Sequence, residues 1–405
     1  MLIKARYVVP VDAPVIEDGG VKIEGGKITA VGPARELSDD ATTDYGDAVI
    51  CPGFVNAHTH LELTSCAGLV PPTPEFIDWL QHLIAVAKDK LATGEAVSAS
   101  VLAGIEQSLR SGVTLVGDIT SRPDLSRPHL AKSALRCVSF GEVIAIGTLR
   151  DRVTEPLEAA LDRELQSATF RVGVSPHAPY TVEPTPMRRC AARADEVDAP
   201  IAIHLAETDA ETEFTRNGSG PFAQHLQALG VWDNRIPVPQ CSAVELANRC
   251  GVLGPRTVIA HGNYVTDLEL EFIARSGASV AYCPRTHDAF GHEPHRFRDM
   301  LALGVNVGIG TDSLASNTTL GILDAMRFLH RSFSHLPPRT ILKMATLNGA
   351  KALGWDKIGT IAVGAEADLI AIPLTAAPSD PLIDLLQSSA QPRITLVRGQ
   401  IAFSA

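Results

Sequence analysis

Short apolar runs alternate with longer amphipathic stretches along most of this chain. Eight of these runs have the composition of buried strands, and they span residues 49–55, 113–116, 137–140, 170–174, 201–203, 257–260, 278–282 and 305–309. The stretches between them are typical of helices, as at 95–110 and 320–335. Eight strand–helix repeats predict a closed parallel (β/α)8 barrel of the TIM type, in the α/β class.

The two ends of the chain follow a different pattern. Residues 8–33 contain short β-branched stretches interrupted by glycine pairs, which is typical of hairpins, and residues 367–372 and 393–403 return to this style. Neither end is large enough to be stable alone. We therefore expect residues 1–50 and 360–405 to pair into one small β-sandwich beside a barrel formed by residues 51–359.

A polar or ionisable residue closely follows every apolar run. These residues are His58, Asp118, Glu142, His177, His204, His261, Arg285 and Asp312. The carboxyl ends of the strands form the active-site mouth of such a barrel, so we expect these side chains to converge there. The 60- and 57-residue intervals that begin at His58 and His204 are longer than one strand plus one helix. They place insertions at about 63–95 and 208–255, which either cover the mouth as lids or pack against another subunit.

Composition and charge narrow the range of partners. The chain has 405 residues, 45% of them hydrophobic and 20% charged, which are ordinary values for a globular protein with a large core. Its 35 basic and 46 acidic residues give a net charge of −11, which argues against nucleic acid or an anionic membrane as a partner. The seven scattered cysteines are typical of reduced thiols. We expect a cytoplasmic homo-oligomer, in its simplest form a dimer, that acts on a small molecule.

The strand-end residues include a set suited to binding a metal ion. In the His58-Thr59-His60 segment, strand alternation sends both imidazoles to the same side. His204, His261 and Asp312 end three other predicted strands. Each alone could be a satisfied core or turn residue. Together they would be costly to bury without a partner, and a bound divalent cation would offset that cost.

These segments resemble the amidohydrolase superfamily. The resemblance covers nearly the whole chain and rests on residues 53–60, on His204-x-x-Glu207, on His261-Gly262 and on residues 310–313. It implies a metal-dependent hydrolase. Residues 170–182 lack the lysine that bridges two ions in binuclear members, so the site is similar to that of the mononuclear deaminases. The implied ligands are His58, His60, His204 and Asp312, which suit one zinc ion or, alternatively, iron.

The resemblance also implies a role for each remaining polar group. The metal lowers the pKa of a bound water, and Asp312 orients that water and accepts its proton. Glu207 protonates a ring nitrogen of the substrate and then the departing amine, although a solvated loop carboxylate is the alternative. His261 aims the nucleophile or donates a hydrogen bond to the developing oxyanion.

Four further residues are candidates for contacts with the substrate. Glu62 either pairs with ring N–H or sugar hydroxyl groups or braces a loop, and His177 matches a histidine that approaches the substrate in adenine nucleoside deaminases. Arg285 either holds a carboxylate or forms a surface ion pair. Trp79 either stacks on a base or closes the site, or else it anchors an amphipathic helix. The histidine-rich stretch 286–298 has no assigned role.

Residues 56–64, 177–182 and 283–316 are most similar to deaminases of adenosine-like nucleosides. The resemblance implies hydrolysis of a 6-aminopurine nucleoside to the 6-oxo product with release of ammonia. Aminodeoxyfutalosine of an alternative menaquinone pathway is the first candidate substrate, and S-adenosylhomocysteine, methylthioadenosine and adenosine follow. A second class keeps the same metal site but removes chloride from triazines or opens a lactam. A non-enzymatic scaffold would be expected to have lost the ligands.

Overall fold

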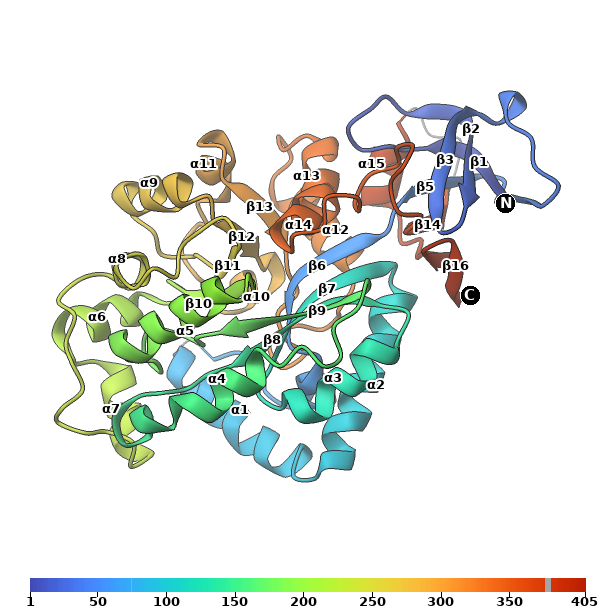
Figure 1. Ribbon diagram of the computed structural model, residues 1–405. Coiled ribbons are helices and arrows are strands. Elements are labelled where there is room, and N and C mark those ends of the chain that lie inside the picture. Colours follow the sequence, from blue (N-terminus) through green and yellow to red (C-terminus); the bar gives the residue numbers. More distant parts are fainter. Residues whose placement is uncertain (74, 376–379) are drawn as a thin grey trace.

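The computed structural model describes residues 1–73, 75–375 and 380–405, which form two sheets and their covering helices (Figure 1). One sheet contains eight parallel strands that are neighbours in sequence order. They are β6 (Phe54–Thr59), β7 (Val113–Thr120), β8 (Arg136–Glu142), β9 (Phe170–Ser175), β10 (Ile201–Leu205), β11 (Thr257–His261), β12 (Ser279–Tyr282) and β13 (Asn306–Ile309). A parallel bridge between Thr59 and Asp312 joins the first strand to the segment after the last. The predicted (β/α)8 barrel is confirmed.

Helices surround the barrel, and shorter helices lie within the connections between its strands (Figure 1). They are α1 (Phe76–Lys90), α2 (Gly94–Arg110), α3 (Pro123–Lys132), α4 (Thr154–Ala160), α5 (Pro184–Glu196), α6 (Asp209–Asn217), α7 (Pro221–Ala228), α8 (Ala243–Arg249), α9 (Asp267–Ser276), α10 (Pro284–Ala289), α11 (Phe297–Ala302), α12 (Ile322–Ser332), α13 (Pro338–Ala345), α14 (Leu347–Ala352) and α15 (Pro381–Gln387), with short 3-10 turns η1 (Ala34–Glu36), η2 (Leu61–Cys66) and η3 (Gly147–Val153). None of the helices in the described ranges is long and apolar enough to cross a membrane.

Helix α2 illustrates how the sequence determines where a helix begins and which face it buries. It begins after Thr93, whose side chain accepts a hydrogen bond from the backbone N–H of Ala96 and so satisfies one of the free donors of the first turn. Its buried residues include Val97, Val101 and Ile105. Because they recur every four positions, they lie on one face of the helix, and that face packs on the barrel.

The second sheet combines both ends of the chain. Its strands are β1 (Leu2–Val8), β2 (Ile16–Glu24), β3 (Lys27–Pro33), β4 (Thr42–Asp44), β5 (Ala48–Pro52), β14 (Leu369–Pro373), β15 (Ile394–Val397) and β16 (Gln400–Ser404). The hydrogen-bonded order is β16-β15-β14-β5-β1-β2-β3, with β4 paired to β1. Both termini therefore lie in the same lobe, apart from the barrel (Figure 1).

The predicted strand 49–55 is in fact two strands in two sheets. β5 pairs with β14 in the terminal sheet, whereas β6 starts the barrel. Gly53 separates them, and a Cβ atom there would lie 2.3 Å from the side chain of Thr114. The chain crosses between the two sheets at a point where no larger residue fits.

A buried arginine fastens the terminal sheet to the barrel. Arg136 begins β8 and is 1% exposed, with its Nε 2.6 Å from Oδ2 of Asp368 and its Nη2 2.8 Å from Oε2 of Glu366. The guanidinium also lies over the ring of Trp355, 5.2 Å from its centroid. Because Asp368 directly precedes β14, this contact fixes how the two sheets meet.

Candidate active site

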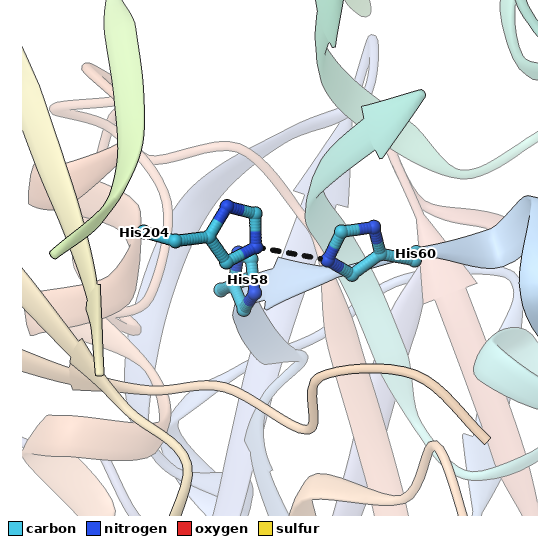
Figure 2. Close-up of side chains that lie close together, drawn as sticks. All are labelled: His58, His60 and His204. Carbon is cyan, nitrogen blue, oxygen red and sulfur yellow. Dashed lines mark hydrogen bonds between the residues drawn. The ribbon is translucent and has the colours of Figure 1, made fainter. Parts of the chain in front are cut away.

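Side chains from three strand ends of the barrel meet at one point. His58 and His60 come from the end of β6, His204 from β10 and Asp312 from the turn after β13. Nε2 of His60 is 3.2 Å from Nε2 of His204, and the ring of His58 lies beside both (Figure 2). Oδ1 of Asp312 is 3.5 Å from Nε2 of His58 and 3.5 Å from Nε2 of His60.

This cluster fits a divalent cation. Nε2 of His58 is buried and has no hydrogen-bond partner among the described residues. Burial, with the neighbouring charge of His58, lowers the pKa of His60 to about 3, and burial also holds the pKa of His204 well below its usual value. Neutral imidazoles present free lone pairs, and three imidazoles with a carboxylate are a donor set that suits zinc or iron. His261 is close enough to His58 and Asp312 to be a further donor.

The backbone around Asp312 is held in an unusual conformation. Its φ of 56° lies in the left-handed region. Its carbonyl oxygen accepts a hydrogen bond of 2.9 Å from the Thr59 hydroxyl, and its Oδ2 accepts one of 2.5 Å from Ser316. Burial by itself would raise the pKa of Asp312, but the close approach of His58 and the charges of His60 and His261 lower it below its usual range.

Glu207 lies next to His261 at the same mouth. The two side chains are 5% and 2% exposed, and Oε1 of Glu207 is 3.5 Å from Nε2 of His261. Burial, reinforced by the charges of Asp312 and Glu211, raises the pKa of Glu207 well above its usual value. The raised pKa favours the protonated form of this carboxyl, which suits a group that gives up a proton.

Glu211 is a supporting residue that the sequence analysis missed. Its carboxylate accepts hydrogen bonds from the backbone N–H groups of Ala206, Glu207 and Thr208, at 2.9, 2.6 and 3.2 Å. Ala206 has a φ of 52°, so the turn that presents Glu207 is strained and Glu211 holds it. The segment Thr208-x-x-Glu211 is a capping box at the start of α6, which is the signal that could have identified this residue.

The unassigned stretch 286–298 contains a second supporting residue. Nε2 of His295 donates a hydrogen bond of 2.9 Å to the carbonyl oxygen of His261, whose φ of 69° is also left-handed. The His295 ring stacks on Tyr282, with 4.0 Å between centroids. Nε2 of His287 donates to the carbonyl oxygen of Glu293, at 2.9 Å, and folds the stretch back on itself. His295 therefore holds the backbone of a residue at the mouth.

His177 lies against the cluster formed by His58, His60 and His204. Its ring centroid is 4.9 Å from that of His204, and its carbonyl oxygen accepts the backbone N–H of His204 at 2.9 Å. Its Nδ1 is 2.6 Å from the hydroxyl of Thr181, and its Nε2 is 3.7 Å from Oε1 of Glu142. Burial, with the charge of Glu62, raises the pKa of Glu142 to about 8.

The other two polar candidates, Arg285 and Glu62, differ in how their charged groups are bound. The guanidinium of Arg285 bonds to the Asn317 side chain at 3.1 Å and to Thr318, and it pairs with no carboxylate in the described part of the chain. Glu62 instead accepts three hydrogen bonds, of 2.8 to 3.0 Å, from Thr120 and Ser121. Those contacts brace the loop after β7, which is the second of the two interpretations given for Glu62.

Trp79 belongs to an aromatic cluster, defined here as Phe76, Trp79, Tyr180, Phe222 and Phe290. Trp79 is buried on α1, and its indole N–H donates to the carbonyl oxygen of Ala315 at 3.4 Å. Tyr180 stacks on Phe222 with centroids 3.8 Å apart, and Phe222 is 6.3 Å from Phe76. The two predicted insertions thus pack against each other through Phe76 of α1 and Phe222 of α7, whereas Trp79 anchors α1 against Phe290 and Ala315.

Known proteins resemble this chain over nearly its whole length. The amidohydrolase family model matches residues 49–402. A 5-methylthioadenosine/S-adenosylhomocysteine deaminase of Nitratidesulfovibrio vulgaris (strain DSM 19637 / Miyazaki F) is 34% identical over 100% of this chain and 92% of the relative.

Two solved structures share the whole fold. An adenosine deaminase from Xanthomonas campestris with bound zinc superposes with a TM-score of 0.84, at 27% identity, over 100% of this chain and 92% of the other. The aminofutalosine deaminase of Helicobacter pylori in complex with methylthio-coformycin gives a TM-score of 0.88, at 22% identity, over 99% of each chain.

Proposed function

The chain belongs to the amidohydrolase family and is a hydrolase of carbon–nitrogen bonds, and from that premise we propose that it removes the 6-amino group of an adenosine derivative. Water replaces the amine at C6 of the purine, so that a 6-oxo purine and ammonia are formed. The observation that carries this proposal is the buried Glu207, with its raised pKa, beside His261 and the histidine cluster.

We assign the metal site to His58, His60, His204 and Asp312. A divalent cation, zinc before iron, would supply Lewis acidity that makes water a nucleophile near neutral pH. The remaining chemistry falls to side chains. Asp312 takes a proton from the attacking water, Glu207 protonates the adjacent ring nitrogen, and Nε2 of His261 can donate a hydrogen bond to the new oxygen.

The same groups complete the reaction when the amine leaves. Glu207, now a carboxylate, relays the proton of the new C6 hydroxyl group to the amine, which departs as ammonia. The proton held by Asp312 then restores Glu207, so the site returns to its starting charge. One water is consumed and no oxidant or reductant is needed.

Arg285 supports a narrower choice of substrate. A guanidinium held by neutral groups, with no carboxylate bonded to it in the described ranges, suits a substrate that brings its own carboxylate. Aminodeoxyfutalosine is therefore our first candidate and S-adenosylhomocysteine the second, since each carries such a group.

A panel of purine and pyrimidine substrates tests the reaction. Zinc-loaded protein is assayed for ammonia release from aminodeoxyfutalosine, S-adenosylhomocysteine, methylthioadenosine, adenosine, guanine and cytosine. We expect turnover of the adenine nucleosides, fastest for those with a carboxylate. If protein with stoichiometric metal releases no ammonia from any adenine nucleoside, the proposal is contradicted, and hydrolysis of a lactam or of a carbon–halogen bond is favoured.

A further inference from the structure

The carboxyl group of Glu142 has no role in the reaction described above, yet it lies at the mouth. Glu142 ends β8, and its side chain is 13% exposed. Among the described residues its carboxyl makes no hydrogen bond, and its nearest polar partner is Nε2 of His177 at 3.7 Å. A ligand atom of Glu142 lies within 4.8 Å of ring nitrogens of both His177 and His204.

Three other carboxylates near the mouth are supplied with donors. Glu62 accepts three hydrogen bonds and Glu211 accepts three backbone N–H groups. Glu183 is bound by Gly147 and Arg150. The Glu142 carboxyl, on a side chain that is 13% exposed at the mouth, has no such donor among the described residues, so it can accept one from a ligand.

His177 presents a second acceptor beside this carboxyl. The Thr181 hydroxyl donates to the carbonyl oxygen of Ala178 at 3.1 Å, so it accepts from Nδ1–H of His177 at 2.6 Å. The proton on Nδ1 leaves Nε2 of the neutral ring as an acceptor, facing Glu142. A carboxyl keeps an acceptor oxygen in either protonation state. The pair Glu142–His177 therefore calls for a ligand that offers O–H or N–H groups.

We propose that Glu142 is a specificity-determining residue which, with His177, binds the ribose hydroxyls of the substrate and selects ribonucleosides over deoxyribonucleosides. This inference rests on the proposed function, because it takes an adenosine derivative as the ligand. Apart from the amino group that reacts, the 2′- and 3′-hydroxyls are the only donors that all the candidate nucleosides share.

Equilibrium binding of unreactive nucleosides tests this inference without any turnover. Inosine, 2′-deoxyinosine and 3′-deoxyinosine lack the 6-amino group, and their Kd values are measured by calorimetry on the zinc-loaded protein. A deoxynucleoside would leave the Glu142–His177 pair without one of its donors, and an acceptor left without a donor is costly. We therefore expect at least one deoxynucleoside to bind roughly 10- to 100-fold more weakly than inosine, since about 1.4 kcal/mol corresponds to tenfold.

Two variants and a control assign the effect to Glu142. In Glu142→Ala the ratio of deoxyinosine to inosine Kd should fall to within about threefold of unity. Glu142→Gln keeps an acceptor oxygen and should retain part of the ratio, which guards against misfolding of the alanine variant. Glu155→Ala removes an exposed carboxylate on α4, the helix that follows β8, and should leave every Kd unchanged.

The possible outcomes separate this inference from the reaction. An equal ratio in wild type and Glu142→Ala, or no nucleoside binding by wild type, overturns the role of Glu142. A ratio that collapses in Glu142→Ala but not in Glu155→Ala supports it, even if the ammonia assay finds no deamination. In that case the reaction fails while the ribose contact stands.

Discussion

At the scale of single residues, burial sets the ionisation that the chemistry needs. The imidazoles of His60 and His204 have lowered pKa values, which suits neutral ligands, whereas the raised pKa of Glu207 suits its proposed role as a proton donor. Both effects have the same cause, because removal from water disfavours the charged form of either group.

The replacement Glu207→Gln tests the proton donor directly. The amide keeps the size of the side chain but cannot deliver a proton, so kcat should fall on the order of 10²-fold or more. Metal content, measured by atomic absorption, should stay stoichiometric, because Glu207 is outside the proposed ligand set. Glu213→Gln, an exposed carboxylate on α6, serves as the control. Normal turnover by Glu207→Gln would show that the proton comes from elsewhere.

The replacement Arg285→Ala tests how the substrate tail is bound. Loss of the guanidinium should raise KM for aminodeoxyfutalosine and S-adenosylhomocysteine by about 10-fold or more, since a charge-assisted hydrogen bond contributes about 1.5–3 kcal/mol. KM for adenosine should change far less. Steady-state kinetics on these three substrates decide the question, and equal increases would mean that Arg285 does not bind the carboxylate.

The residue types in the motifs were predictable from sequence, but several roles were not. His58, His60, His204 and Asp312 meet as expected because each ends a strand of the same barrel. The contacts of Glu62 with Thr120 and Ser121 could not be foreseen, because they depend on how two loops meet in space.

At the scale of elements, the strand-end turns are strained and each is held by a distant side chain. The turns at Ala206, His261 and Asp312 all have positive φ, which costs of order 1–3 kcal/mol for a residue other than glycine. Glu211, His295 and Thr59 respectively bind the backbone at these points. Hydrophobic periodicity predicted the strands but carries no information on these turns.

His295 provides the test at this scale. His295→Ala removes the donor to the carbonyl oxygen of His261, so His261 should lose its fixed position. We expect kcat to fall about 10-fold, the equivalent of one lost hydrogen bond of roughly 1.4 kcal/mol, while KM changes little. His295→Gln can still donate and should recover part of kcat. A purely structural role would lower Tm in both variants without this recovery.

The boundary between β5 and β6 marks the limit of pattern-based prediction. Residues 49–55 form one continuous apolar run, so a single strand was expected. Packing of Gly53 against Thr114, which only the folded chain reveals, divides the run between two sheets.

At the scale of the whole molecule, a buried ion pair joins the two sheets. Arg136 and Asp368 are 1% and 2% exposed. Asp368→Asn would leave the guanidinium without its buried carboxylate, and breaking such a pair typically costs about 3–5 kcal/mol. We expect a clear loss of Tm in calorimetry.

A surface pair offers a matched control for that variant. Asp195 and Arg256 form an exposed ion pair at 2.8 Å, so Asp195→Asn should cost no more than about 1 kcal/mol. Equal losses of Tm in the two variants would contradict the view that Arg136 fastens the terminal sheet to the barrel.

The pairing of β5 with β14 has a consequence for how the protein is made. A ribosome releases β5 early, but its partner strand follows only after the whole barrel has been translated. At about 5–20 residues per second, the edge of β5 stays open for tens of seconds. An open strand edge invites pairing with other chains, so the nascent protein is most exposed to aggregation, and most in need of chaperones, during this interval.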